Sequence, residues 1–194
     1  MKVAVVKYNA GNVESVKNAL NRLNIEPILT DAPEELQTAD KVIFPGVGEA
    51  SSAMNYLKNR GLDKIIVSLK QPVLGICLGM QLLCESSEEN ETPCLGILPY
   101  RVKKFESDTL KIPQMGWNNI FNLKSKLFDG VAESVFVYFV HSFYVESGAE
   151  TIATADYETH FSAAINHENF YAVQFHTEKS GAVGERILEN FLRI

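Results

Sequence analysis

Gly75-Ile76-Cys77-Leu78-Gly79 follows the apolar run Pro72-Val73-Leu74 and precedes Met80-Gln81-Leu82-Leu83. This order predicts a strand, a sharp turn and a helix, with a cysteine at the corner. A glycine on either side of the cysteine permits a tight backbone path and removes side chains that would crowd the corner. A cysteine at a helix start faces unpaired N–H groups and the positive end of the helix dipole, and both favour the reactive thiolate. The pattern also fits a buried cysteine in an ordinary strand–helix turn, because free cysteines are among the most buried residues.

The chain before this elbow alternates strands with helices, which predicts a parallel, doubly wound sheet. Strands are expected at residues 2–6, 26–30 and 41–44. A helix with Asn12 as its N-cap follows the first strand, and a capped short helix follows the second, over residues 31–36. Helical segments at residues 50–60 and 62–70 lead into the elbow.

The chain after the elbow changes character. Residues 85–91 are acidic and polar, so we expect an exposed loop, unless one of its carboxylates meets a cationic ligand group. Further strands are expected at residues 101–105, 117–121, 135–140, 151–157, 161–166 and 171–175, with turns at 113–116 and 168–169. An amphipathic helix over residues 182–192 ends the chain. With no visible repeat or linker, we expect one α/β domain over residues 1–194, a three-layer sandwich whose twisted, mostly parallel (mixed) sheet lies between helices.

Composition narrows the class of partner. The chain carries 18 Lys and Arg against 24 Asp and Glu, a net charge of −6, which argues against nucleic acid. No apolar run is long enough to span a bilayer, and the first residues read as a strand rather than a signal peptide, so no membrane partner is expected. The three cysteines are odd in number and lack metal-site spacing. We therefore expect free thiols in a reducing, cytoplasmic compartment, with no metal and no cofactor.

A cysteine nucleophile needs a base and a group that orients the base. His176-Thr177-Glu178, just past a predicted strand, is the strongest candidate. Side chains two apart in an extended segment point the same way, so His176 and Glu178 are both predicted to face Cys77. The histidine would take and return the proton, and the glutamate would fix its tautomer. Of the other histidines, His160 and His167 are expected at the surface, and His141 is either a satisfied core residue or part of the site.

Two stretches resemble the triad-type, class I glutamine amidotransferases: residues 75–81, which contain the cysteine elbow, and residues 174–180, which contain His176 and Glu178. Four more stretches resemble one subfamily, the glutaminase subunit of imidazole glycerol phosphate synthase from histidine biosynthesis. They are Tyr8-Asn9-Ala10-Gly11-Asn12, Pro45-Gly46-Val47-Gly48, Pro113-Gln114-Met115-Gly116-Trp117-Asn118 and Tyr138-Phe139-Val140-His141-Ser142. The resemblance runs from the first strand to the last helix, and it implies the flavodoxin-like fold of that family.

The resemblance also implies roles for individual residues. Cys77 would attack the side-chain amide of L-glutamine, with His176 and Glu178 completing a catalytic triad. The implied oxyanion hole consists of backbone groups of Val47, Gly48 and Leu78. The implied substrate-binding residues are Gln81, Glu89, Ser142 and Phe143. A loop such as Pro45-Gly46-Val47-Gly48 is an ordinary turn in most proteins, but the carboxyl ends of strands in an open α/β sheet are where ligands bind.

A partner is implied as well. In this subfamily ammonia passes to a (β/α)8-barrel cyclase subunit, which makes imidazole glycerol phosphate and an aminoimidazole carboxamide ribotide. Positions that face the partner and the ammonia passage match Asn12, Trp117, Tyr138 and Lys179. Trp117 could instead be a core aromatic residue, and Lys179 a solvated charge. One residue departs from the family pattern, because Thr177 stands where proline is usual between the catalytic His and Glu.

Three alternatives remain open from the sequence. The same glutaminase chemistry could feed a related synthase in nucleotide-sugar or surface-polysaccharide synthesis. The chain could be a stand-alone cysteine hydrolase or peptidase on this fold, active without a partner. A scaffold without catalytic activity is disfavoured, because all three triad residue types are present.

Overall fold

A seven-stranded sheet forms the centre of the protein in a computed structural model that describes residues 1–9 and 12–194. Its strands are β1 (Val3–Val6), β2 (Ile28–Thr30), β3 (Lys41–Gly46), β4 (Val73–Cys77), β11 (Thr151–Tyr157), β12 (Thr159–His167) and β13 (Phe170–Val173). Their order across the sheet is β11-β12-β13-β4-β3-β1-β2. The pairings β2–β1, β1–β3, β3–β4 and β4–β13 are parallel, and those of β12 with its two neighbours are antiparallel. The predicted mixed, mostly parallel sheet is therefore confirmed.

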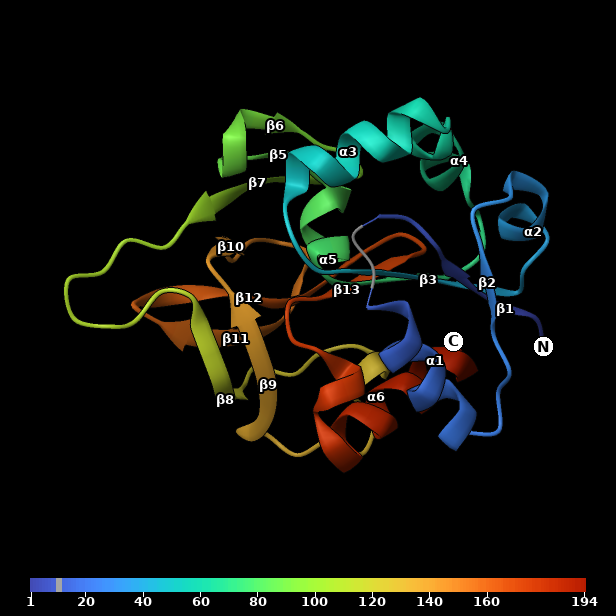
Figure 1. The fold of residues 1–194 in the computed structure, drawn as a ribbon. Helices are drawn as coiled ribbons and strands as arrows, with labels where there is room; N and C mark the ends of the chain where they lie inside the picture. Colours follow the sequence, from blue (N-terminus) through green and yellow to red (C-terminus); the bar gives the residue numbers. More distant parts are fainter. Residues whose placement is uncertain (10–11) are drawn as a thin grey trace.

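Helices cover both faces of this sheet (Figure 1). One face carries α1 (Val13–Arg22) and α6 (Gly181–Arg193), and the other carries α2 (Pro33–Gln37), α3 (Ala50–Asn59), α4 (Leu62–Ser68) and α5 (Leu78–Leu83). Alternate residues of β1 show the reason: Val3 and Val5 belong to the core cluster under α1 and α6, whereas Ala4 and Val6 belong to the cluster under α2 to α5. Successive side chains of a strand point to opposite faces of the sheet, so this one buried strand contributes to the apolar core on each face.

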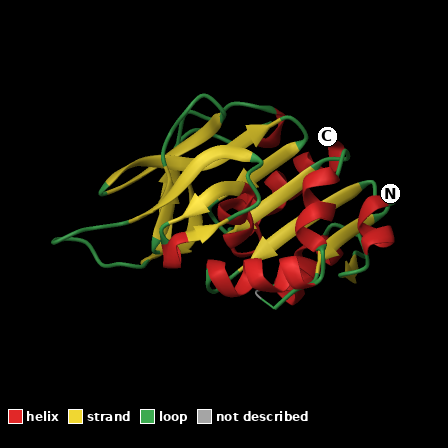
Figure 2. Ribbon diagram, turned by 90° about the horizontal axis from the view of Figure 1, so that it is seen from above, coloured by secondary structure: helices red, strands yellow, loops and turns green. Residues whose placement is uncertain are grey.

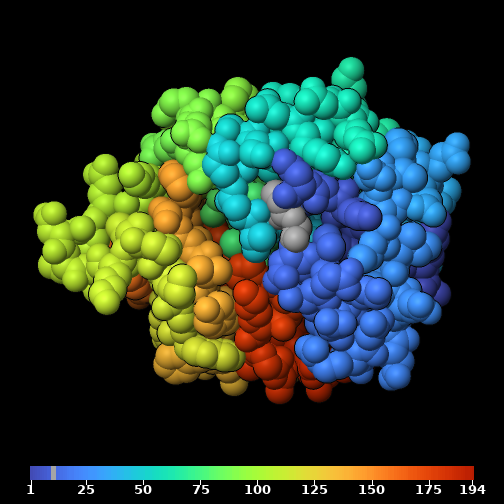
Figure 3. All heavy atoms as spheres, in the orientation of Figure 1, coloured from blue at the N-terminus to red at the C-terminus, as the bar shows by residue number. Residues whose placement is uncertain are grey.

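The second half of the chain adds a smaller β region. A four-stranded sheet contains β5 (Cys84–Ser87), β6 (Thr92–Pro93), β7 (Leu98–Lys104) and β10 (Phe143–Val145), and a two-stranded sheet pairs β8 (Gln114–Ile120) with β9 (Val135–His141). Short 3-10 helices form at η1 (Glu89–Glu91), η2 (Lys126–Phe128) and η3 (Thr177–Lys179). Figure 2 shows that this end of the molecule consists of strands and loops, with the main helices gathered at the other end. Residues 106–113, between β7 and β8, project from the body (Figure 3).

Two predictions about this region are wrong. Residues 85–91 are not one exposed loop: β5 pairs with β6 and β7 as far as Ser87, with Cys84 and Ser87 buried, and only a turn and η1 follow. Of the acidic side chains that suggested a loop, Glu88 and Glu91 meet Arg101 on the outer side, whereas Glu89 is partly buried. Residues 113–116 are not a turn either, because β8 begins at Gln114 and pairs with the last residues of β9.

The predicted N-caps also differ from the structure. Asn12 precedes α1, but its side chain makes no capping hydrogen bond and donates instead to Glu178. The short helix α2 has no side-chain cap, and the N–H of Ala32 binds the hydroxyl of Thr30. Two residues of the Tyr8–Asn12 motif, Ala10 and Gly11, lie outside the described residues. Across the described ranges, no helix is both long and apolar enough to cross a membrane.

Candidate active site

The elbow forms where the sequence predicts it, with β4 ending at Cys77 and α5 beginning at Leu78. Cys77 has φ 55° and ψ −112°, a conformation that is strained for a residue with a side chain. A Cβ atom on Gly79 would lie 1.8 Å from the carbonyl oxygen of Phe44, so only glycine lets α5 pack this closely on β3. Gly75 is similarly crowded, because a Cβ there would lie 2.9 Å from the Leu83 side chain. The tight packing of α5 holds the strained cysteine at the edge of the sheet.

Three neighbouring strands bring the candidate residues together at that edge. β3 runs parallel to β4 and pairs Gly46 with Cys77, so Val47 and Gly48 follow beside the nucleophile. β13 runs parallel to β4 on its other side and leads to His176, whose N–H donates to the carbonyl of Tyr138. The carboxyl ends of parallel strands are where ligands bind in open α/β sheets.

His176 and Glu178 form a buried pair. Nδ1 of His176 lies 2.7 Å from Oε1 of Glu178, and each side chain is only 1% exposed. The predicted reason for this contact was wrong, because Glu178 lies in η3 rather than in an extended segment. The tight 3-10 turn brings the carboxylate back to the ring. Nε2 of His176 has no nitrogen or oxygen partner among the described residues and is left for the Cys77 thiol.

Electrostatics favour the protonated imidazole. Burial alone would lower the pKa of His176, but interactions with Cys77 and Glu178 outweigh it and raise this pKa to about 10. A cysteine next to an imidazolium is stabilised as the thiolate, which is the nucleophilic form. The protonated His176 is therefore placed to stabilise a thiolate on Cys77 when the nucleophile forms.

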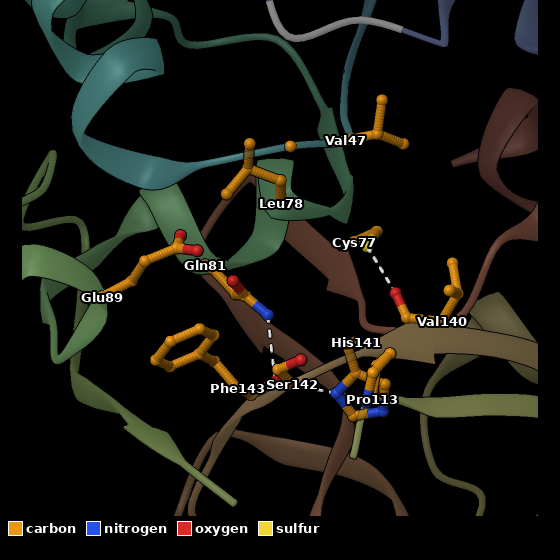
Figure 4. A pocket seen from close by; sticks show the side chains of 11 residues that line it. Val47, Cys77, Leu78, Gln81, Glu89, Pro113, Val140, His141, Ser142 and Phe143 are labelled. Carbon is orange, nitrogen blue, oxygen red and sulfur yellow. Dashed lines mark hydrogen bonds between the residues drawn. The ribbon is translucent and has the colours of Figure 1, made fainter. Parts of the chain in front are cut away.

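A cavity of about 280 Å³ opens in front of Cys77 (Figure 4). All the residues that the resemblance assigns to the oxyanion hole and to substrate binding line it: Val47, Gly48, Leu78, Gln81, Glu89, Ser142 and Phe143. Leu78, as the first residue of α5, has no partner within the helix for its N–H. Gly48 has φ 99°, a conformation that favours glycine. The structure thus gathers these residues at one cavity, and their individual roles stay predictions.

Two polar side chains at the cavity are held by backbone groups. Nε2 of Gln81 donates to the carbonyl of Phe143 at 3.1 Å. Glu89 accepts from the N–H of Ala50 at 2.7 Å, and burial raises the pKa of its carboxyl although this hydrogen bond lowers it. Both side chains are thus oriented before any ligand arrives.

His141 combines the two interpretations that the sequence left open. It lines the cavity, and both ring nitrogens have partners: Nδ1 donates to the carbonyl of Phe143 at 2.7 Å, and Nε2 lies 2.9 Å from the side-chain amide of Gln114, whose NH2 group donates to the neutral ring. Burial lowers the pKa of His141 to about 4, so its ring is neutral near pH 7. His160 is exposed and His167 is partly exposed.

The residues assigned to the partner side lie together around η3. Nδ2 of Asn12 donates to Oε1 of Glu178 at 3.1 Å, directly behind the catalytic pair. The ammonium of Lys179 lies 5.7 Å from the centre of the Tyr138 ring, and the Trp117 ring meets Tyr138 edge-on at 6.0 Å. Trp117 is 56% exposed, so it is not a core aromatic residue.

Sequence reasoning missed Gln174. Its side chain is fully buried between Cys77 and Gln81. The signal was available, because Gln174 stands two residues before His176, and side chains two apart on an extended segment share a face.

Thr177 is expected to tolerate the proline that is usual at this position. As the first residue of η3, it has no helical partner for its N–H, and the preceding residue is extended (φ −88°, ψ 102°), as a residue before proline should be. Thr177→Pro should leave glutaminase turnover within an order of magnitude and raise the free energy of unfolding by about 0.5–1 kcal/mol. Steady-state kinetics and urea unfolding test both expectations.

Thr177→Val is the matched control, since Oγ1 of Thr177 is buried without a partner among the described residues. Removing this hydroxyl should stabilise the fold by about 1 kcal/mol without restricting the backbone. Complete loss of turnover in the proline variant, with normal turnover in the valine variant, would show that the backbone before Glu178 does not have the extended conformation that accepts proline.

Known proteins resemble the chain along its whole length. The family model for glutamine amidotransferase class-I matches residues 4–194. The imidazole glycerol phosphate synthase subunit HisH of Bacteroides thetaiotaomicron is 59% identical over 194 residues, covering 99% of both chains, and that of Blochmanniella floridana is 45% identical over all of both chains. Among solved structures, a glutamine amidotransferase from Thermotoga maritima has a TM-score of 0.65 at 19% identity, covering 100% of this chain and 83% of its own, and thus shares the fold. The chain belongs to the class I glutamine amidotransferase family.

Proposed function

We propose that the protein is the glutaminase subunit of imidazole glycerol phosphate synthase. It hydrolyses L-glutamine to glutamate and ammonia and supplies the ammonia to a cyclase subunit in histidine biosynthesis. The observation that carries this proposal is the buried His176, which binds the Glu178 carboxylate and interacts with Cys77, the nucleophile in the cavity lining. The names of the relatives favour this synthase over the other pathway and over a stand-alone hydrolase.

The proposed reaction begins with attack by the Cys77 thiolate on the side-chain carboxamide carbon of glutamine. The resulting oxyanion accepts hydrogen bonds from the N–H of Leu78 and from the Val47-Gly48 segment. His176 then donates its proton to the departing nitrogen, so ammonia leaves and a Cys77 thioester remains. Water attacks the thioester carbonyl while His176 takes back a proton, which releases glutamate and restores the thiolate.

The cavity suits a small amino acid. A volume of about 280 Å³ is at the lower end of ligand pockets, and its walls provide Gln81 and the raised-pKa carboxyl of Glu89. These polar groups lie on the α5 side of the cavity, away from β9 (Figure 4). We propose that they bind the amino-acid end of glutamine, with backbone at Ser142 and Phe143 assisting.

The exposed face of β8 and β9 is the proposed cyclase-docking surface. The register pairs Met115 with Val140 and Trp117 with Tyr138, which places these side chains and Phe136 on one face. Met115, Trp117 and Phe136 are 67%, 56% and 59% exposed, which is unusual clustering for large apolar side chains. This face is continuous with Lys179 and, through η3, with the catalytic pair. Ammonia released at Cys77 would therefore leave close to the partner.

Trp117→Ala should weaken binding of the cyclase by about 10- to 100-fold, because large aromatic side chains at the centre of an interface contribute most of its binding energy. Isothermal titration of the purified cyclase into the variant measures this change. Val67→Ser is the matched control, since Val67 is also exposed (46%) but lies on α4, away from β8 and β9. Equal affinities for the Trp117 variant and the control would place the docking surface elsewhere.

The proposed function is tested by measuring glutamate release with and without a co-purified barrel cyclase and its nucleotide substrate. We expect release only in the complex, together with stoichiometric formation of imidazole glycerol phosphate. Full activity of the chain alone would favour a stand-alone hydrolase, and capture of a different synthase would favour the other pathway. A cytoplasmic location is proposed on the same basis, because the relatives are named as subunits of a biosynthetic enzyme.

A further inference from the structure

Gln174 links the nucleophile to the substrate side of the cavity. It follows β13, and its N–H donates to the carbonyl of Ala163 at 2.8 Å, which fixes the backbone. Its side chain is fully buried, with Nε2 3.7 Å from Sγ of Cys77 and Oε1 3.0 Å from Nε2 of Gln81. An amide in this place contacts the reacting sulfur directly.

The surrounding hydrogen bonds determine which way this amide points. Nε2 of Gln81 donates to the carbonyl of Phe143, which also binds Nδ1 of His141 at 2.7 Å. With one amide hydrogen of Gln81 used there, the other is donated to Oε1 of Gln174. The NH2 group of Gln174 must then face Cys77.

Two contacts of Sγ distinguish the thiol from the thiolate. The thiol donates its proton to the carbonyl of Val140, 3.8 Å away (Figure 4), and a thiolate has no proton to give to that oxygen. The N–H of Gln174, in contrast, is a donor, and donors stabilise an anion more than a neutral sulfur. Deprotonation of Cys77 therefore exchanges the Val140 contact for a stronger one with Gln174.

We infer that Gln174 is a further catalytic residue, which stabilises the Cys77 thiolate and holds Gln81 in its substrate-binding orientation. This inference deepens the proposed glutaminase function and rests on it for the role of the thiolate. Both amide hydrogens of Gln81 are used by Phe143 and Gln174, so its Oε1 is left as an acceptor for the glutamine α-ammonium.

Other groups near Cys77 contribute in different ways. His176, backed by Glu178, supplies the positive charge that favours the thiolate. The Tyr8 hydroxyl is neutral near pH 7, because burial and the proximity of Cys77 raise its pKa, and His141 is also neutral. Among the described residues, Gln174 differs from these neutral groups because its side chain donates a hydrogen bond to Sγ, beside the one charged partner His176.

The test compares Gln174→Met and Gln174→Glu in the full chain, in a Cys94→Ser background that removes the partly exposed thiol. The rate at which iodoacetamide alkylates Cys77 is measured from pH 4 to pH 10 by peptide mass spectrometry. We expect the methionine variant to react about 10-fold more slowly below the wild-type midpoint, and its midpoint to move to higher pH. In the glutamate variant this midpoint should move to still higher pH, because a carboxylate repels a thiolate. Gln37→Leu, an exposed amide on α2, is the control and should leave the profile unchanged.

The alkylation profile needs neither glutamine nor cyclase, so it tests Gln174 even if the proposed pathway is wrong. In the cyclase complex, the methionine variant should also show a lower kcat and a higher KM for glutamine, since both thiolate and Gln81 are affected. If the glutamate variant does not fold, the methionine variant alone decides. If a Gln174 variant with a normal circular dichroism spectrum shows the wild-type alkylation profile, the inference is overturned. Gln174 would then be a structural residue, even if the melting temperature of the variant is lower.

Discussion

Cys77→Ala should lower glutamine-dependent turnover of the synthase by more than about 1,000-fold, because no other group can form the thioester. The side chain sits at a strained φ of 55° and points into the cavity between Val47 and Val140 (Figure 4). No other cysteine can replace it, since neither of the other two lines this cavity: Cys84 is buried at the end of α5, and Cys94 lines a separate cavity beside α3 and α4. The measurement is glutamate release by the complex at saturating glutamine.

Ammonium salts supply the control for this variant. If the chain only delivers ammonia, external ammonia should support the cyclase equally well with the variant and with the wild type, which shows that the variant still folds and docks. Cys94→Ser is the matched control for thiol loss and should keep full glutamine-dependent turnover. A Cys77→Ala protein that still releases glutamate would exclude the thioester mechanism.

The elbow and the parallel arrangement of the strands before it were predictable because their signals are local. The glycine–cysteine–glycine pattern of Gly75, Cys77 and Gly79 predicts a tight strand–helix corner within five residues. Apolar runs that alternate with amphipathic helices predict a parallel sheet. The packing that makes these glycines necessary is a contact between α5 and Phe44, more than thirty residues earlier. The sequence predicted the corner but not the contact that requires it.

The second sheet was missed because its signal depends on partners that are distant in sequence, and the same holds for the partners of Gln174, although its place two residues before His176 was a local signal. β5 is short and polar, with Glu85 exposed, and only its pairing with β6 and β7 turns that stretch into a strand. The link from Gln174 to Cys77 spans 97 positions, and that from Gln81 to Gln174 spans 93. The contact between His176 and Glu178 was predicted correctly for the wrong reason, since a 3-10 turn rather than an extended strand brings them together.

Glu178→Gln should lower kcat by about 100- to 10,000-fold while the protein still folds and binds the cyclase. The carboxylate accepts from Nδ1 of His176 at 2.7 Å and from the Asn12 amide at 3.1 Å, and it is almost fully buried. Glutamine keeps the size but not the charge, so the imidazolium loses its counter-ion and its tautomer is no longer fixed. Asn12→Ala is the matched control, because it removes the second hydrogen bond to Glu178 but keeps the charge of the carboxylate. It should lower kcat by less than about 10-fold. Equal losses in the two variants would show that orientation rather than charge is what Glu178 provides.

The pH dependence separates these roles further. Burial lowers the pKa of His176, but Cys77 and Glu178 together raise it to about 10, above its value of about 6.5 in the unfolded chain. This pair therefore adds stability that is complete below about pH 6.5 and is lost as the pH rises towards 10. In Glu178→Gln the imidazolium is less favoured, so the basic limb of kcat/KM should move to lower pH, and the melting temperature should fall less between pH 7 and pH 10 than in the wild type. An unchanged basic limb would mean that the proton lost there does not belong to His176. The loss of activity at high pH would then come from another titrating group.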